Sequence, residues 1–505
     1  MDECVNYCAQ FGKVINVFHY VTSIQNPHLL LVEYNHLNAV HNVMNNATSV
    51  GGPECIPVIT KVFRFNPKTK TLNNGQFKHE PINMYSNKYP TQVTIKESLS
   101  KTTSVADQMI KLQHLLQLHD CDVRLRFYTA SQLQLCFSRL FPTLSVLPFG
   151  SSVTGFGLLK CDLDLVCTFS STHNTHDSVS KQNLMYYYKQ YSYTERGEQQ
   201  QFLKLLAYIA SKFIPGISNT QCILEARVPI IKFHNRLTHL YCDLSSTHLT
   251  AFHMSEILFT YGQFDPRVKP LVYTIRTWAK SQKLTNDSPG RWISNFSLTL
   301  MIIFYLQSKK ILPPMKKLFS QKVNGTLKQI TTSKIDLSTK SYTLYELLCD
   351  FFEYYIIFDF KIYGLCILDG VMKRKLDASP VYIFNPLEPM LNVSKNITTT
   401  ELFNIKTQMQ EAILAMKKDK LFNILYLLNM SPNDEGRDQK NVTSSNVATT
   451  SITSYKSVST NRECDERENS INNVAPGEQS KSAAEEFLIE TGIVDDTNKL
   501  DEIIK

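Results

Sequence analysis

Long apolar runs and paired cysteines are both missing from this 505-residue sequence. No apolar stretch approaches the roughly 18 residues that a membrane-spanning helix needs, so the sequence predicts no membrane span. Its 12 cysteines form no Cys-x-x-Cys pair and match no zinc-site spacing, which indicates reduced thiols in a cytosolic or matrix compartment. The first twelve residues contain no Arg or Lys, so no transit peptide is visible there.

Hydrophobic residues are scarce after Met430, where Ser, Thr, Asn and charged residues dominate. We therefore predict that residues 431–505 form a disordered acidic tail. This tail holds 8 Lys and Arg against 15 Asp and Glu, a net charge of −7, and the whole chain has +8, so residues 1–430 carry +15. A basic body suits a polyanionic substrate, and an acidic partner protein or a membrane surface fits the same charge.

A short turn followed by two carboxylates is the most informative feature of the chain. In Phe149-Gly150-Ser151-Ser152 the glycine lets the backbone approach a phosphate, and the serine hydroxyls and amides can donate to it. Asp162 and Asp164 alternate with apolar residues on a predicted buried strand, so they share one face, about 6 to 7 Å apart. Such a pair can reach two divalent ions about 4 Å apart, which activate a hydroxyl and neutralise a leaving pyrophosphate. Either half alone is weak evidence, but the ordered combination predicts nucleotidyl transfer.

A third carboxylate, Asp243, lies in a second predicted strand. The run from Ala226 to Phe233 and the run from His239 to Ser245 both have strand character and are separated by a short turn. We therefore predict a hairpin that places Asp243 beside the strand of Asp162, where it completes the set of ion ligands. Without the upstream motif, Asp243 would simply mark the end of a strand.

Further motifs carry a resemblance to a known family over roughly residues 85 to 425. They are Tyr261-Gly262-Gln263-Phe264-Asp265-Pro266-Arg267-Val268, Trp278-Ala279-Lys280, Ile293-Ser294-Asn295-Phe296-Ser297-Leu298 and Tyr382-Ile383-Phe384-Asn385-Pro386-Leu387-Glu388. With the turn and the acids, they fall in the family's order. The chain resembles the DNA-polymerase-beta-like nucleotidyltransferases of the non-nuclear poly(A) polymerase and terminal uridylyltransferase group. Within that group it is most similar to the mitochondrial poly(A) polymerases.

The resemblance implies a template-independent enzyme that adds AMP from ATP to RNA 3′ ends with Mg²⁺ or Mn²⁺, and it implies a mitochondrial location. Asp162, Asp164 and Asp243 would be both the catalytic residues and the metal ligands. The residues expected at the nucleotide are Phe149, Gly150, Ser151, Arg276, Lys280, Asn295 and Phe296. A terminal uridylyltransferase is the alternative within this fold. A catalytically silent RNA-binding scaffold is the alternative of another class, and the presence of all three acids argues against it.

Several of the nucleotide residues also have a physical interpretation of their own. Arg276 and Lys280 lie at i and i+4 of a predicted helix, so they share a face that could hold a triphosphate or simply meet solvent. Ser294 and Asn295 are favourable N-cap residues before an apolar helix, whose free amides could face an anion. The resemblance implies that Phe296 stacks on the incoming base. The apolar run that contains Phe296 also fits an ordinary helix core.

Base and ribose selectivity depend on two departures from the relatives. Uridylyltransferases of this group tend to have a His before the Asn that matches Asn392, and this chain has Leu391 there. The loss of that polar partner argues against uracil and favours ATP. The relatives' ribose-contacting Asn has no counterpart between Ala251 and Glu256, where Ser255 is the candidate substitute.

The predicted fold is α+β, with a nucleotidyltransferase palm of mixed sheet and helices at 141–250. A mainly helical central domain would comprise 95–140, with helices at 105–118 and 128–140, together with 251–430. Residues 1–65 resemble a truncated RRM-like α/β module that lacks its first strand, which suggests a start internal to a longer precursor or a poorly folded module. In the family this module is a dimerisation element, so a homodimer is expected. Residues 66–94 are predicted to be a linker and 171–200 a surface insertion.

Overall fold

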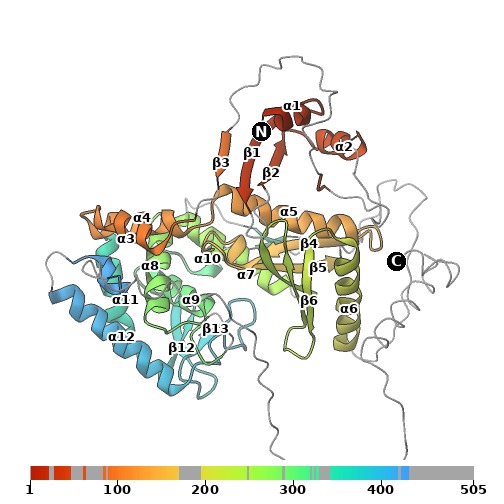
Figure 1. Ribbon diagram of the computed structural model, residues 1–505. Coiled ribbons are helices and arrows are strands. Elements are labelled where there is room, and N and C mark those ends of the chain that lie inside the picture. The colour runs from red at the N-terminus through yellow and green to blue at the C-terminus, as the bar shows by residue number, and fades with distance from the viewer. Residues whose placement is uncertain are drawn as a thin grey trace, which may run out of the picture. The chain divides into compact units, whose positions relative to one another are not determined.

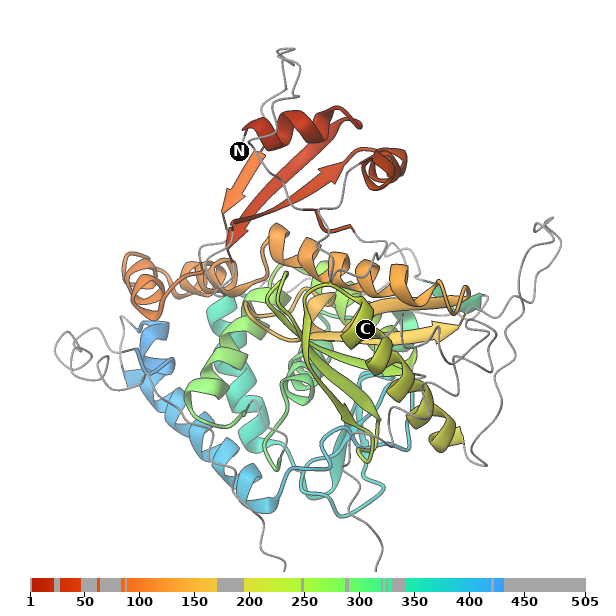
Figure 2. The same cartoon turned by 45° about the vertical axis from the view of Figure 1, so that its right-hand side comes forward.

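The structure is a computed structural model, shown in two views in Figure 1 and Figure 2. It describes residues 2–21, 28–46, 61–63, 83–86, 89–169, 195–246, 249–286, 290–318, 321–323, 326–328, 342–418 and 422–430. The predicted acidic tail and most of the predicted insertion lie outside the described residues. Within those ranges, no helix combines the length and apolar character that crossing a membrane requires.

A five-stranded mixed sheet forms the palm. Its order is β4-β5-β8-β7-β6, with β5 parallel to β8 and the other neighbours antiparallel. The strands are β4 (Leu144–Phe149), β5 (Leu163–Phe169), β6 (Ile217–Ile223), β7 (Ile230–Asn235) and β8 (Leu240–Ser246). Helices α5 (Asp120–Phe137) and α6 (Glu195–Phe213) share one hydrophobic core with this sheet and lie beside it in both views. The predicted mixed sheet and the predicted hairpin, now β7 and β8, are confirmed.

Alternation along the strands separates a core face from a second face. Leu163 and Leu165 on β5, and Cys242 on β8, are buried in the core that includes α5 and α6. Asp164 and Asp243 occupy the intervening positions of the same two strands, so they lie on the opposite face. Helix α7 (Leu249–Phe264) contacts β4 and β5 and does not belong to the α5 and α6 core.

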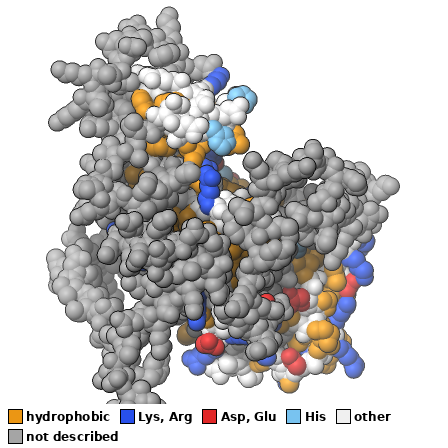
Figure 3. Space-filling model, turned by 90° about the vertical axis from the view of Figure 1, so that its right-hand side faces the viewer, with side chains coloured by type: hydrophobic (Ala, Val, Ile, Leu, Met, Phe, Trp, Pro, Cys, Tyr) orange, Lys and Arg blue, Asp and Glu red, His pale blue; other side chains and the backbone are white. Residues whose placement is uncertain are grey.

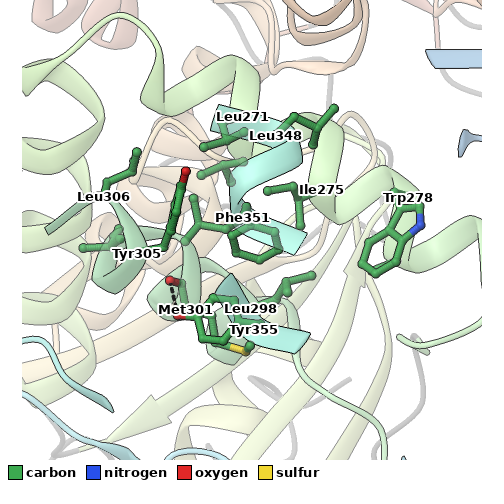
Figure 4. Close-up of a cluster of buried hydrophobic side chains, with 14 of the residues drawn as sticks. Leu271, Ile275, Trp278, Leu298, Met301, Tyr305, Leu306, Leu348, Phe351 and Tyr355 are labelled. Carbon is green, nitrogen blue, oxygen red and sulfur yellow. Dashed lines mark hydrogen bonds between the residues drawn. The ribbon is translucent and has the colours of Figure 1, made fainter. Parts of the chain in front are cut away.

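The helical part of the chain is organised around a larger core. Its helices are α3 (Gln92–Ser100), α4 (Val105–Leu116), α7, α8 (Val268–Ser281), α9 (Asn295–Ser308), α10 (Met315–Leu318), α11 (Leu344–Ile357), α12 (Thr399–Lys418) and α13 (Ile424–Leu427). Figure 4 shows side chains of α8, α9 and α11 packed together, among them Trp278, Tyr305 and Phe351. Tyr355 is fully buried, and its hydroxyl donates to the carbonyl of Met301 at 2.7 Å. Its polar atom is therefore satisfied inside the core.

Short strands interrupt the region that the sequence predicts to be mainly helical. A small sheet of order β12-β11-β13 consists of β11 (Tyr363–Cys366), β12 (Val371–Arg374) and β13 (Ile383–Phe384). A separate pair consists of β9 (Gln321–Val323) and β10 (Thr326–Lys328). These strands are two to four residues long, too short for a two-residue periodicity to stand out in the sequence.

The N-terminal module contains α1 (Asp2–Ala9), β1 (Val14–Val21), β2 (His28–Tyr34) and α2 (Leu37–Asn46). The sequence predicts a helix over 2–11, strands over 14–20 and 29–34, and a helix over about 37–45, which agree with these bounds to within a few residues. A third strand, β3 (Asn83–Ser86), pairs in parallel with β1 and gives the order β2-β1-β3. It lies inside the range predicted to be a linker, and helix α3 begins before that range ends. Its four polar-rich residues gave no strand signal.

Helix α5 differs most from its prediction. It begins at Asp120 instead of residue 128, and His119 starts it with a capping box to Asp122. Its apolar residues Leu133 and Phe137 are fully buried in the core of the palm sheet, so α5 packs on the palm and not on the central helices. The assignment of 95–140 to the central domain therefore holds for α3 and α4 only, since these two helices contribute to the larger core.

Candidate active site

Two of the predicted carboxylates, Asp164 and Asp243, lie side by side on one face of the palm sheet. Strand register pairs Phe149 on β4 with Asp164 on β5, Asp164 with Asp243 on β8, and Asp243 with Lys232 on β7. Neighbouring strands are about 4.8 Å apart, so Asp164 and Asp243 are adjacent. The sequence predicts that Asp162 lies within the strand of Asp164. In the structure, Asp162 instead precedes the first residue of β5.

The electrostatics of Asp164 identify this pair as part of a concentrated negative site. Burial, together with the charges of Asp243 and Asp162, raises the pKa of Asp164 to about 7, while Lys232 opposes the shift. The structure therefore brings all three predicted acids within electrostatic reach of one another. A raised pKa of this origin means that the folded protein disfavours the charge on Asp164 unless a cation compensates it.

Lys232 provides part of that compensation and was missed by the sequence reasoning. Its Nζ lies 2.7 Å from Oδ2 of Asp243, and both side chains are partly exposed. In the described residues, no three His, Cys, Asp or Glu side chains converge closely enough to hold an ion as they stand. The donor set nevertheless fits Mg²⁺ or Mn²⁺, because these ions prefer carboxylate oxygens and three carboxylates lie within electrostatic reach of one another. The signal available in the sequence was the alternation of polar and apolar residues along β7, which places Lys232 on the same face of the sheet as Asp243.

The turn after β4 lies directly against Asp164. Gly150 has φ +66°, a conformation that favours glycine, and a Cβ added there would collide with the Asp164 carboxylate. Ser152 is buried, and Arg126 donates to its hydroxyl at 3.2 Å, so Ser152 supports the turn from beneath. Ser151 is only half-buried. The predicted combination of turn and acids is therefore close in space as well as in sequence.

Ser255 on α7 fixes this turn from the other side. The Gly150 amide donates to the Ser255 hydroxyl at 2.8 Å, and that hydroxyl donates to the Ala251 carbonyl at 2.8 Å. Ser255 is 3% exposed. The Ser255 hydroxyl, predicted from the sequence to contact the ribose, thus makes both of these hydrogen bonds with backbone atoms. Ser255 is therefore a positioning residue for Gly150.

Replacing Ser255 with Ala should disturb this turn. We expect Ser255→Ala to raise the KM for ATP about tenfold, because it leaves the Gly150 amide without its partner at a cost of about 1–2 kcal/mol. Steady-state kinetics with varied ATP would measure the effect. Ser211→Ala is the matched control, since Ser211 makes a similar bond to its own helix at an exposed position of α6. An unchanged KM in Ser255→Ala would remove Ser255 from the site.

Arg276 and Asn295, two of the predicted nucleotide residues, meet in the structure. Arg276 is 8% exposed, its Nη1 donates to the Phe156 carbonyl at 2.6 Å, and its Nε donates to Oδ1 of Asn295 at 3.3 Å. Burial lowers the pKa of the guanidinium. On the same helix, Tyr273 donates to the Gly157 carbonyl at 2.8 Å. Helix α8 therefore holds the loop that joins the serine turn to the acids.

Lys280 and Phe296 occupy more open positions. Lys280 is exposed on α8, one turn after Arg276. The two cations that the sequence places on one helix face therefore differ in burial, because Arg276 is buried and Lys280 is exposed. Ser294 is the N-cap of α9, as predicted, and accepts from the Ser297 amide at 3.0 Å. Phe296 is half-buried and packs at the border of the larger core, which leaves part of its ring exposed.

The loop expected to select the base is internally hydrogen-bonded. Asn392 is 7% exposed; its amide oxygen accepts from the Ile383 and Ser394 amides, and its amide nitrogen donates to the Val381 carbonyl. Leu391 is half-buried, and its carbonyl accepts from the Asn385 amide at 3.0 Å. Asn392 thus shapes the loop, and Leu391 offers no side-chain hydrogen bond.

Known proteins are similar to this chain in sequence. A family model described as "Poly(A) RNA polymerase, mitochondrial-like, central palm domain" matches residues 105–263. The chain is 32% identical over 446 residues to the mitochondrial poly(A) RNA polymerase of Drosophila melanogaster, covering 83% of this chain and 72% of that protein. It is 33% identical over 415 residues to the mitochondrial poly(A) RNA polymerase of Homo sapiens, covering 79% and 70%.

Solved structures agree with the sequence matches. A crystal structure of mtPAP in complex with ATPgammaS has a TM-score of 0.74 and 30% identity, covering 85% of this chain and 93% of that chain. The corresponding complex with UTP has a TM-score of 0.73 and 31% identity, with the same coverage. Other mtPAP structures contain GTP and CTP. These likenesses extend over the palm and the helical part together and bear out the predicted α+β fold.

Proposed function

The chain belongs to the mitochondrial poly(A) RNA polymerase family, and we propose that it transfers AMP from ATP to RNA 3′ ends at the carboxylates of its palm sheet. The observation that carries this proposal is the adjacency of Asp164 and Asp243 in strand register, with the Gly150 turn against Asp164. That arrangement combines a phosphate-holding turn with anionic ligands for divalent ions, which is what nucleotidyl transfer requires.

Each acid has a distinct task in this proposal. Asp162, Asp164 and Asp243 would hold two Mg²⁺ or Mn²⁺ ions, which supply Lewis-acid activation of a hydroxyl and charge neutralisation on the phosphates. Asp243 is partly exposed and helps to take the proton of the RNA 3′-hydroxyl. Lys232, which pairs with Asp243 here, keeps that carboxylate oriented.

The nucleotide would lie between the Gly150 turn and the start of α9. Phe149, Gly150 and Ser151 face the phosphates through the turn, and Asn295 and Phe296 lie at the ribose and base. Two of the five N–H groups of Arg276 are engaged by Phe156 and Asn295, which leaves guanidinium donors for a phosphate oxygen. Lys280 supplies a second, exposed cation.

Lys280 should therefore affect nucleotide binding without affecting stability. We expect Lys280→Ala to raise the KM for ATP about tenfold, because a phosphate loses one partly exposed cation, and to leave the unfolding midpoint unchanged. ATP titrations of the extension rate would measure it. Lys111→Ala, at an exposed lysine on α4, is the matched control. Equal KM values for the two variants would contradict a role for Lys280.

ATP is the proposed donor because Leu391 offers no polar partner to uracil. The mtPAP crystals with UTP, GTP and CTP indicate that occupancy of such a site does not by itself select a base, so selectivity must be measured in turnover. A terminal uridylyltransferase is the second candidate. Leu391→His distinguishes the two, since it should raise UTP use relative to ATP if Leu391 sets the preference.

RNA is the proposed acceptor, and the basic charge of residues 1–430 supports it. Lys and Arg side chains lie along the lower edge of the described surface in Figure 3. The direct test is extension of a labelled single-stranded RNA with ATP and Mg²⁺. Extension supports the proposal, whereas RNA binding without extension by any nucleotide would support the scaffold alternative.

A mitochondrial location is proposed from the named relatives. We also propose dimerisation through the N-terminal module, because β2 is an edge strand of its described three-stranded sheet and presents backbone groups for pairing. Analytical ultracentrifugation of the whole chain tests this, and a monomer at micromolar concentration would contradict it.

A further inference from the structure

An exposed aromatic side chain stands on the catalytic face of the palm, next to the acids. Tyr241 lies two residues before Asp243 on β8, so both project from the same face about 7 Å apart along the strand. Tyr241 is 61% exposed, although the cysteine and leucine positions beside it on β8 are buried. A single exposed apolar side chain is ordinary on a protein surface, but this ring lies beside a proposed catalytic acid, where a substrate could contact it.

The Tyr241 ring is supported from the neighbouring strand. His234 is its register partner on β7, and the two ring centroids are 4.7 Å apart with an interplanar angle of 33°. His239 meets His234 edge-on at 5.3 Å and 80°. Three rings from one hairpin therefore form a continuous aromatic cluster, in which Tyr241 and His239 are exposed and His234 is buried between them.

His234 acts in this cluster as a flat support for the Tyr241 ring. It is 7% exposed, and within the described part of the chain its Nε2 has no hydrogen-bond partner. Burial lowers the pKa of His234, and the neighbouring His239 and Arg236 lower it further. A neutral buried ring behind Tyr241 restricts the tyrosine to a defined orientation at little cost in entropy.

The surroundings of Tyr241 match the chemistry of single-stranded nucleic acid binding. Lys232 and Arg236, on the same hairpin, are partly exposed and exposed cations. Proteins that hold single strands combine cations for the phosphates with aromatic rings on which bases stack. The hairpin that carries Asp243 supplies both.

We propose that Tyr241 is a stacking surface for the base of the 3′-terminal RNA nucleotide, with His234 as its support. This inference rests on the proposed function, because it takes the RNA 3′-hydroxyl to lie at Asp243. A nucleotide whose ribose lies at Asp243 places its base within reach of a ring two strand positions away. The ligand class is a single-stranded polyribonucleotide, held without regard to sequence since every base has a π-face.

The test uses a short RNA with 2-aminopurine at its 3′ end, whose fluorescence falls when the base is stacked. Tyr241→Val and Tyr241→Thr both retain strand propensity but remove the ring, and Tyr241→Phe retains it. We expect Val and Thr to abolish the quenching and raise the RNA KM about tenfold, with the KM for ATP and the unfolding midpoint unchanged. Tyr241→Phe should behave as wild type. Tyr426→Val, at another half-exposed tyrosine, is the matched control.

The outcomes separate this inference from the proposed function. Wild-type extension of RNA together with unchanged quenching and RNA KM in Tyr241→Val and Tyr241→Thr would overturn the stacking role and leave the enzyme assignment standing. Loss of RNA affinity in Tyr241→Phe as well would also overturn it, since the ring is kept there. Failure of the wild type to extend RNA with any nucleotide would reject the proposed function, whatever the fluorescence shows.

Discussion

Asp164→Asn is expected to lower the rate of AMP transfer by about 10³-fold or more, while RNA affinity stays within about twofold of wild type. Asp164 lies between the Gly150 turn and Asp243, at the centre of the proposed metal site. Losing one anionic ligand from such a site removes about 4 kcal/mol of transition-state stabilisation, which corresponds to about 10³ in rate. Single-turnover extension with saturating ATP would measure the rate.

The same substitution should not destabilise the fold. The pKa of Asp164 is raised to about 7 by burial and by the neighbouring acids, so the folded protein disfavours its charge. An amide of the same shape is therefore expected to keep or raise the unfolding midpoint in EDTA. Asp350→Asn is the matched control, because Asp350 pairs with Lys309 outside the palm. Near wild-type transfer by a folded Asp164→Asn protein would contradict the proposed site.

Arg276→Met is expected to lower the free energy of unfolding by about 2–4 kcal/mol and to raise the KM for ATP at least tenfold. The guanidinium is buried, and its loss leaves the Phe156 carbonyl and the Asn295 amide oxygen without their donor. The loop between the serine turn and Asp162 would lose one of its two ties to α8. Denaturant unfolding and ATP titration would measure the two effects.

Arg139 is an exposed arginine just after α5, so Arg139→Met controls for the loss of an arginine as such. We expect it to change neither quantity appreciably. If Arg276→Met were as stable as this control and raised only the KM for ATP, the buried contacts would be unimportant and Arg276 would be a pure phosphate ligand. If it changed only stability, Arg276 would have no place among the nucleotide residues.

Strand positions near the site could be predicted because each depends on a local pattern. The acids Asp162 and Asp164 follow a turn of small residues, and apolar neighbours indicate a buried strand, which places Asp164 on β5. The hairpin that carries Asp243 was predicted for the same reason, and register then brings Asp164 and Asp243 together. The resemblance supplied the roles, which periodicity alone does not contain.

Long-range contacts could not be predicted in this way. The ion pair between Lys232 and Asp243 spans two strands, and the hydrogen bond from Gly150 to Ser255 joins positions 105 residues apart. No local pattern distinguishes Ser255 from any other helix serine. The helix over 128–140 was assigned to the central domain, and only tertiary packing shows that its apolar residues belong to the core of the palm sheet.

The most direct test of the account is to incubate the whole chain with a single-stranded RNA, Mg²⁺ and all four nucleoside triphosphates at equal concentration, and to sequence the added tails. Competition is essential, because a nucleotide that only binds contributes nothing to the tail. The account predicts tails composed almost entirely of A, absent with Asp164→Asn. Tails rich in U or of mixed composition, or no tails from a folded protein that binds RNA, would contradict it.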